Sequence, residues 1–392
     1  MPDYKYLIIG GGMTADSAVR GIREIDAAGS IGLLCSEPSP PYERPPLSKA
    51  LWKGKQFDSI WRGTGAVPGV TMHLETTAAR IEPAAKQVID SNGAAYQYEK
   101  VLLATGGSPR KLEFAGSRCI YFRTVDDYRR LRSLAGEGTR FAVIGGGFIG
   151  SEIASALTMN GKSVVMIFPE TGIGARMFPA DLSEAVTQLY RRKGVEILSG
   201  MAVQGIESAG GRLMLRASGA QPLPADGIVA GLGIIPNAEL AADAGLEVND
   251  GVVVDEFLRT TSADIYAAGD VARFYHPSLG RTLRVEHEDN ANTMGRAAGR
   301  NMAGAAEPYS HLPFFYSDLF ELGYEAVGEL DSRLETVSEW KEPFREGIVY
   351  YLRDSKICGV LLWNVWEKVD AARAVIGTGY GRPHPSGSPI PI

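Results

Sequence analysis

The sequence has few cysteines and histidines, and neither type is spaced like a reactive pair or a metal site. Cys35, Cys119 and Cys358 are isolated within 392 residues. Flavoproteins that relay electrons through a redox-active cysteine pair need that pair beside the flavin, so this class is excluded. Isolated thiols are typical of a reducing cytoplasm, which is the location we expect. The five histidines show no ligand spacing, and we expect no metal.

The sequence also lacks long apolar runs and an excess of basic residues. No run is long enough to span a bilayer, and the first predicted strand begins so close to Met1 that we expect no signal peptide. The net charge of −6 argues against general binding to nucleic acid. Basic residues do cluster at 123–132 and 191–193. Such clusters are typical of solvated helix faces, and the alternative is docking of an acidic protein.

What the sequence does contain is a glycine-rich turn between a buried strand and a helix. The strand is predicted at 141–144 and the helix at 151–160. The turn carries Gly145, Gly147 and Gly150. In this motif the first glycine permits the tight turn, the second lets backbone approach a pyrophosphate, and the third lets helix and strand pack closely. The phosphates then lie at the positive end of the helix dipole.

The same layout occurs near the start of the chain with Gly10, Gly12 and Ala15. About 20 residues after each turn a carboxylate follows the next strand, Glu37 in the first copy and Glu170 in the second, where a ribose 2′-hydroxyl would be held. Two such sites imply two dinucleotides, most simply FAD and a nicotinamide cofactor. The alternative is that the glycine turns serve the chain topology alone.

The choice of nicotinamide cofactor depends on Glu170. A carboxylate accepts a hydrogen bond from a free 2′-hydroxyl and repels a 2′-phosphate, so it favours NADH over NADPH. Arg176 lies a few residues further on and could offset this preference by binding the phosphate.

The order of predicted elements repeats along the chain. Each glycine turn is followed by a helix, a strand (at 163–168 in the second copy), an antiparallel excursion (at about 70–98 and about 202–217) and a closing strand, at 101–107 and again at 227–233. Beyond residue 314 we predict strands, with a hairpin of 347–353 and 357–364 around Asp354-Ser355, and a terminal helix at about 367–376. We predict an α/β fold with two Rossmann-like dinucleotide-binding domains, built as three layers on parallel sheets with antiparallel excursions, plus an α+β C-terminal domain. The predicted boundaries are 1–112 (FAD-binding domain, first part), 113–232 (NAD-binding domain), 233–310 (FAD-binding domain, second part), 311–380 (C-terminal interface domain) and 381–392 (disordered tail).

Three further stretches carry candidate site residues. The proline-rich loop at 38–49 is too irregular for a helix or strand, and its Arg44 and Lys49 could meet the pyrophosphate and the ring system. A short strand ends at Gly269-Asp270, which places an acid where open α/β sheets bind ligands. A helix expected after Glu286-His287 points its N-terminus at the same crevice.

Four motifs, with the paired turns, resemble a known family. They are Tyr42–Lys49, Ala104–Gly107, Ala268–Asp270 and Arg284–His287. Together they resemble the FAD-dependent pyridine nucleotide oxidoreductases of the ferredoxin-reductase type. Within that group, the stretches at 47–52, 168–170, 309–319 and 359–365 are most similar to apoptosis-inducing factor and its bacterial relatives.

The resemblance implies positions around the cofactors. Glu37 would bind the FAD adenosine ribose, Arg44 would lie at the adenine and pyrophosphate end, and Asp270 would hold the ribityl chain. Glu170 would contact the NAD ribose. The other implied cofactor-binding residues are Gly10, Gly12, Ala15, Ala104, Thr105, Gly106, Gly145, Gly147, Gly150, Gly233, Gly269 and Tyr316. Tyr316 departs from the family, which commonly has tryptophan there, so a close copy of the family's aromatic gating is in doubt.

The resemblance also implies five catalytic residues, each with a simpler alternative. Lys49 and Glu152 would pair beside the flavin, or be a surface lysine and a solvent-facing acid of a first helical turn. Phe148 would lie near the nicotinamide, or be a core aromatic. Glu286 and His287 would line the catalytic face. For His287 the alternative is a helix-start residue satisfied by backbone.

Two functions follow from this resemblance. In the first, hydride passes from NADH to FAD, and electrons then pass to a small carrier of the ferredoxin or rubredoxin type or to a quinone. In the second, the protein is a redox sensor like apoptosis-inducing factor, in which a long-lived charge-transfer complex between reduced FAD and NAD is coupled to dimerisation. A homodimer is compatible with both. The C-terminal domain lacks the long insertion of the animal apoptosis proteins, which argues against a death-related role.

Overall fold

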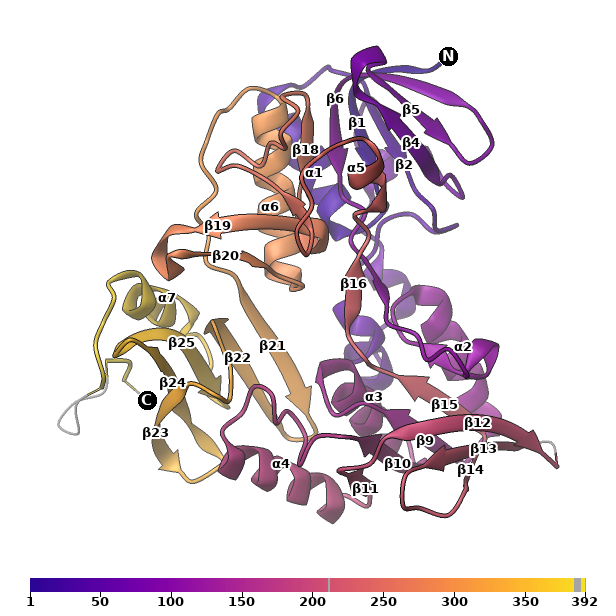
Figure 1. The fold of residues 1–392 in the computed structure, drawn as a ribbon, viewed down its shortest axis with the longest axis vertical. Coiled ribbons are helices and arrows are strands. Elements are labelled where there is room, and N and C mark those ends of the chain that lie inside the picture. The colour runs from indigo at the N-terminus through magenta and orange to yellow at the C-terminus, as the bar shows by residue number, and fades with distance from the viewer. Residues whose placement is uncertain (211, 384–388, 392) are drawn as a thin grey trace. The chain divides into compact units, whose positions relative to one another are not determined.

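The computed structural model describes residues 1–210, 212–383 and 389–391. The chain divides into two compact units (Figure 1). The first unit comprises Met1–Glu43, Asp58–Ser108 and Ile235–Pro313, and the second comprises Arg44–Phe57, Pro109–Ile234 and Phe314–Ile392. Each unit is therefore assembled from three separate stretches of the chain.

The first unit is built on a sheet in the order β3-β2-β1-β6-β5-β4, with β18 paired to β6. The strands are β1 (Asp3–Ile9), β2 (Ile31–Leu34), β3 (Val70–His73), β4 (Ala78–Glu82), β5 (Gln87–Asp90), β6 (Ala95–Leu103) and β18 (Ile265–Ala267). Pairs β1–β2, β2–β3, β1–β6 and β6–β18 are parallel, whereas β4–β5 and β5–β6 are antiparallel. The antiparallel excursion predicted at 70–98 is thus confirmed for β4 to β6 and wrong for β3.

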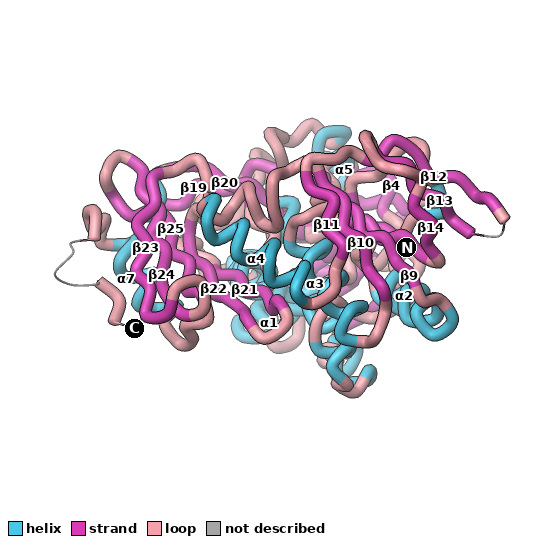
Figure 2. Tube along the Cα trace, turned by 90° about the horizontal axis from the view of Figure 1, so that it is seen from below, coloured by secondary structure: helices cyan, strands magenta, loops and turns pink. Residues whose placement is uncertain are grey.

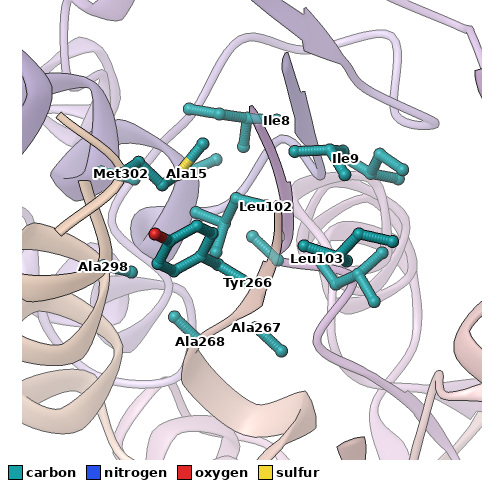
Figure 3. Close-up of a cluster of buried hydrophobic side chains, with 14 of the residues drawn as sticks. Ile8, Ile9, Ala15, Leu102, Leu103, Tyr266, Ala267, Ala268, Ala298 and Met302 are labelled. Atoms are coloured by element: carbon teal, nitrogen blue, oxygen red, sulfur yellow. The ribbon is translucent and has the colours of Figure 1, made fainter. Parts of the chain in front are cut away.

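Two helices cover this sheet and pack along each other, α1 (Met13–Ile25) and α6 (Glu288–Met302) (Figure 1). Small buried side chains, among them Ala15, Ala18 and Ala298, let the helices approach closely. Figure 3 shows the core, in which Leu102 and Tyr266 from the strands lie near Met302 of α6. The first unit also contains α5 (Glu239–Asp243) and a small sheet of β17 (Val252–Val253), β19 (Ala272–His276) and β20 (Arg281–Arg284).

The second unit repeats the arrangement in a sheet of order β11-β10-β9-β15-β8. Its strands are β8 (Ile120–Tyr121), β9 (Arg140–Ile144), β10 (Ser163–Phe168), β11 (Glu196–Ser199) and β15 (Gly227–Ala230), and its helices are α2 (Val125–Glu137), α3 (Phe148–Met159) and α4 (Ala180–Arg192). All four strand pairs are parallel. Strands β9, β10 and β15 correspond to β1, β2 and β6, so the duplication inferred from the sequence is confirmed.

A three-stranded antiparallel sheet accompanies this duplicate: β12 (Val203–Ala209), β13 (Arg212–Ala217) and β14 (Leu223–Ala225). The hairpin predicted near 202–217 is therefore present. Two short strands, β7 (Gly107–Pro109) and β16 (Ile234–Pro236), lie where the chain passes from one unit to the other.

The last part of the second unit is an antiparallel sheet of order β21-β22-β25-β24-β23. Its strands are β21 (Phe314–Leu319), β22 (Leu322–Gly328), β23 (Glu335–Glu342), β24 (Glu346–Arg353) and β25 (Lys356–Trp363). Figure 2 shows these strands together, with α7 (Val369–Gly377) beside them. Asp354 and Ser355, at the hairpin turn between β24 and β25, both have positive φ, as a tight turn requires. The hairpin and the terminal helix predicted from the sequence are both observed.

Three expectations can be set beside the structure in detail. The predicted boundaries place Arg44–Phe57 in the FAD-binding domain, whereas this segment clusters with the second unit. Helix α3 starts at Phe148 rather than at 151, because Gly147 already serves as its N-cap. The predicted disordered tail falls partly on 384–388 and 392, outside the described residues. Among its described residues, Arg382 pairs with Glu335 at 2.9 Å and Ile390 is buried. The disorder of the tail stays a prediction.

The division into FAD-binding, NAD-binding and C-terminal domains stays a prediction. In the described part of the chain, no helix combines the length and apolar character that a membrane crossing requires. Within the same residues, histidine, cysteine and acidic side chains do not gather in groups of three that could hold a metal ion.

Candidate functional site

The glycine turn of the second unit shows which glycines the chain itself requires. Gly145 has a φ of +108°, and a Cβ on Gly150 would lie 2.0 Å from the Gly145 carbonyl oxygen. Neither position tolerates a side chain. A Cβ on Gly147 would meet nothing within 4 Å, so protein packing does not explain that glycine. The open backbone at Gly147 suits the pyrophosphate contact predicted for it.

In the first unit, the predicted FAD-binding residues gather at one edge of the parallel sheet. Gly10 follows β1, Glu37 follows β2, Ala104 follows β6 and Asp270 follows β18. Because these strands run parallel, their carboxyl ends share an edge, where open α/β sheets bind ligands. Gly12 is the N-cap of α1 and Ala15 is fully buried beneath it. The structure therefore brings both halves of the first motif together.

Several of these residues are fixed by neighbours. The hydroxyl of Tyr42 donates to Glu37 Oε2 at 2.6 Å. The hydroxyl of Thr105 donates to the Asn237 carbonyl oxygen at 2.7 Å, and the Asn237 amide N–H donates to the Gly106 carbonyl oxygen at 3.0 Å. These bonds hold the edge of the sheet in one conformation. Tyr42 is buried and was not predicted as a site residue, although it lies within a quoted motif.

Glu286 and His287 lie at the start of α6, as the sequence predicted. Glu286 Oε1 pairs with Arg284 Nη1 at 2.7 Å, and His287 is the N-cap residue of the helix. Desolvation lowers the pKa of His287 to about 4, although the charges of Asp270 and Asp289 act in the opposite direction. The imidazole is therefore neutral near pH 7 and is not a reservoir of protons there.

This lowered pKa makes stability depend on pH. Between its ordinary value of 6.5 and about 4, the unfolded chain binds a proton at His287 that the folded chain does not. The free energy of unfolding therefore falls progressively as the pH drops through this range, because proton uptake favours the unfolded chain. We expect the urea midpoint of the wild-type protein to drop between pH 7 and pH 5 by more than that of His287→Gln. Equal drops in the two proteins would contradict the assignment.

In the second unit, Glu170 lies just beyond β10 and pairs with Arg176. The Glu170 Oε1 to Arg176 Nη2 distance is 2.5 Å, with the arginine side chain 84% exposed. The Arg176 carbonyl oxygen accepts a hydrogen bond from the Ser332 amide N–H at 3.0 Å, and the Met177 carbonyl oxygen accepts one from the Tyr351 hydroxyl at 2.9 Å. The C-terminal sheet thus anchors the loop that carries the arginine. The sequence suggested Arg176 as a competitor for phosphate but not this pair.

Lys49 and Glu152 form a buried ion pair in the second unit, with Nζ and Oε1 2.8 Å apart. Their side chains are only 11% and 3% exposed, so both simpler alternatives, a surface lysine and a solvent-facing acid, are wrong. Glu152 also accepts hydrogen bonds from Ser48 Oγ at 2.5 Å and Ser317 Oγ at 2.6 Å. The ammonium group of Lys49 lies 5.0 Å from the centre of the Tyr316 ring.

Ser48 and Ser317 were missed by sequence reasoning. Ser48 adjoins Lys49, which was a usable signal, whereas Ser317 is 165 residues from Glu152 and gave none. Phe148 is 40% exposed, so it is not a core residue; its ring meets that of Phe315 edge to face, with centroids 5.3 Å apart.

Two residues predicted to bind cofactor, Arg44 and Gly233, make hydrogen bonds to other parts of the protein. Arg44, expected at the adenine and pyrophosphate end of FAD, donates to the Arg123 carbonyl oxygen at 2.8 Å within the second unit. Gly233 has a φ of +81°, and its carbonyl oxygen accepts from the Arg110 amide N–H. Their contacts with cofactor remain predictions.

Comparison with protein families shows which family the chain belongs to. Residues 4–295 match the family described as pyridine nucleotide-disulphide oxidoreductase. The chain belongs to this family. Residues 298–343 and 338–378 match the C-terminal part of apoptosis-inducing factor. The chain is accordingly an FAD-dependent oxidoreductase, as the resemblance implied, and it belongs to the family without having a redox-active cysteine pair among its described residues.

Relatives of both predicted types are found. The chain is 35% identical to apoptosis-inducing factor 1, mitochondrial, of Dictyostelium discoideum, over 95% of this chain and 78% of that protein. It is 32% identical to the ferredoxin–NAD(+) reductase component of the anthranilate 1,2-dioxygenase system of Burkholderia cepacia, over 95% and 94%. The solved covalent complex of putidaredoxin reductase with putidaredoxin aligns with a TM-score of 0.89 and 30% identity, over 97% and 94%. These matches confirm the predicted fold class.

Proposed function

We propose that this oxidoreductase accepts hydride from NADH on bound FAD and passes the electrons singly to a ferredoxin-type carrier. The observation that carries the proposal is the buried pair of Lys49 and Glu152. Burying two charges is costly, and replacing such a pair with apolar residues is often neutral or stabilising. A buried pair in a family of flavoproteins is therefore better explained by chemistry than by folding.

The residues of the first unit fit FAD. The sheet edge offers the glycine turn after β1 for a pyrophosphate, a half-buried Glu37 oriented by Tyr42 for a ribose, and Asp270 for the ribityl chain. When bound, FAD supplies the conversion of a two-electron hydride into single electrons. The start of α6 adds the positive end of a helix dipole, which stabilises negative charge. His287 is neutral there and acts by contact rather than by giving up a proton.

The residues of the second unit fit NADH. Gly147 leaves room for the pyrophosphate, Glu170 presents a carboxylate for the ribose 2′-hydroxyl, and Phe148 offers an exposed ring for the nicotinamide. By the family resemblance, Lys49 would lie beside the flavin, where its ammonium would stabilise negative charge on the reduced ring. Glu152 holds that ammonium in place.

A ferredoxin-type acceptor is supported by the names of the relatives. One is a ferredoxin–NAD(+) reductase component, and another was solved in covalent complex with putidaredoxin. The redox sensor is the second candidate, favoured by the match of the C-terminal sheet to apoptosis-inducing factor. We propose a rubredoxin or a quinone as alternative acceptors. We also propose that the protein forms a homodimer.

Turnover separates these functions. The purified protein is titrated anaerobically with NADH and then mixed in a stopped-flow instrument with ferredoxins, rubredoxins, quinones and oxygen. Fast reoxidation by a ferredoxin supports the reductase. The sensor is supported if every acceptor reoxidises the flavin slowly and the long-wavelength absorbance persists. It also requires that NADH increase the mass of the protein in solution to that of a dimer. A colourless protein that does not take up FAD would contradict both.

A further inference from the structure

Four successive residues of strand β21 make contacts within the second unit, and the first three of them contact the catalytic candidates Phe148, Lys49 and Glu152. The Phe315 ring meets that of Phe148, the Tyr316 ring lies 5.0 Å from Lys49 Nζ, Ser317 Oγ donates to Glu152 Oε1 at 2.6 Å, and Asp318 Oδ2 pairs with Lys53 Nζ at 2.8 Å. Successive side chains of a strand point to opposite faces. Accordingly Phe315 and Ser317 contact α3, whereas Tyr316 and Asp318 contact the 44–57 segment.

Within this strand, Ser317 contacts the carboxylate of the ion pair, because its hydroxyl donates to Glu152. It is fully buried, and Glu152 is nearly so. Glu152 Oε1 receives both Ser317 and Lys49, while Oε2 receives Ser48. The carboxylate is thereby fixed by donors from two separate stretches of chain. Removing one donor from a buried carboxylate costs free energy. The position of the Glu152 carboxylate therefore depends on each of its three donors.

We propose that Ser317 is a positioning residue: from the C-terminal sheet it orients Glu152, and through Glu152 it sets where the Lys49 ammonium lies. This inference rests on the proposed function, in which Lys49 stabilises charge on the reduced flavin. The C-terminal sheet then tunes flavin chemistry through one hydroxyl group.

The test is Ser317→Ala in the FAD-loaded protein. Without the hydroxyl, the Lys49 ammonium is held less well, so the reduced flavin is less stabilised. We expect reduction by NADH to slow about tenfold, with little change in the NADH concentration that gives half the maximal rate. We also expect the midpoint potential of the bound flavin to fall by about 30 mV, which corresponds to a tenfold change in the equilibrium constant of a two-electron couple. Ser317→Thr, which keeps the hydroxyl, is expected to recover both.

A matched control is Ser155→Ala. Ser155 is also buried on α3, and its Oγ accepts from the Phe320 amide N–H at 3.2 Å, but it does not belong to the Glu152 cluster. We expect its potential to stay at the wild-type value. In a Lys49→Met background, Ser317→Ala is expected to add no further shift, because the two act through the same charge.

Three outcomes overturn the proposal. Equal shifts of the flavin midpoint potential in Ser317→Ala and Ser155→Ala would show that the effect comes from general packing. Additive shifts in the Lys49→Met background show that Ser317 does not act through Lys49. If Ser317→Ala fails to fold, Ser48→Ala decides, and an unchanged potential there overturns the mechanism. A wild-type protein whose flavin NADH does not reduce refutes the proposed function itself, a result distinct from these three.

Discussion

Replacing Lys49 with methionine is expected to slow the reduction of bound FAD by NADH about 100-fold, the usual effect of removing one preorganised electrostatic group from an active site. Methionine keeps much of the length and apolar stem of lysine but removes the charge. The ammonium lies 2.8 Å from Glu152 and is nearly buried, so water cannot replace it readily. The measurement is the rate of flavin bleaching in anaerobic stopped-flow mixing with NADH.

Loss of the charge also leaves Glu152 without its cation. Breaking a buried pair at one partner costs about 3 to 5 kcal/mol of stability, although the donors Ser48 and Ser317 remain and reduce this cost. The double variant Lys49→Met, Glu152→Gln removes both charges. We expect it to recover most of the lost stability in thermal unfolding while the flavin is still reduced slowly. Recovery of the rate along with the stability would show that Lys49 serves folding and not chemistry.

Lys53→Met is the matched control for this prediction. Lys53 lies one turn further along the same segment and pairs with Asp318 at 2.8 Å, but both side chains are well exposed. Exposed pairs contribute about 0 to 1 kcal/mol, and Lys53 has no assigned role at a cofactor. Its rate of flavin reduction should stay within a factor of two of the wild-type rate.

The sequence was most informative where local periodicity and glycine chemistry decide the structure. The strand at 163–168, the paired glycine turns and the hairpin around Asp354-Ser355 each follow from residues close together in the chain. Their signals survive because a buried parallel strand must be apolar along its whole length and a tight turn must allow positive φ.

Contacts between distant segments were beyond such reasoning. Nothing local to Ser317 indicates that its hydroxyl meets a carboxylate 165 residues earlier, or that Ser332 anchors the loop of Arg176. The resemblance implied the pairing of Lys49 with Glu152, but the burial of the pair and its serine donors follow only from the folding of distant segments onto one another. The placement of Arg44–Phe57 with the second unit was missed for the same reason: a proline-rich loop carries no periodicity that shows which core it joins.

Replacing Glu170 with glutamine is expected to lower the ratio of kcat/KM for NADH over that for NADPH about 100-fold. Two effects add. The carboxylate no longer repels a 2′-phosphate, and Arg176, which pairs with it at 2.5 Å, becomes available to the phosphate. A hydrogen bond to a charged group contributes about 1.5 to 3 kcal/mol, and tenfold in affinity corresponds to about 1.4 kcal/mol, so one new arginine–phosphate contact supplies about tenfold or more.

The arginine makes this prediction separable from a general loss of binding. Its backbone is held by the Ser332 amide N–H, and Phe178 is buried two residues later against the rings of Tyr324 and Trp363, so the loop does not need to refold to present Arg176. The double variant Glu170→Gln, Arg176→Gln should therefore lose the gain in NADPH activity while keeping the weaker use of NADH. Binding of 2′,5′-ADP and of 5′-AMP, measured by calorimetry on each variant, checks the same point without turnover. An unchanged NADH to NADPH ratio in Glu170→Gln would place the ribose away from β10, because a carboxylate in contact with the 2′-position cannot be neutralised without changing the discrimination.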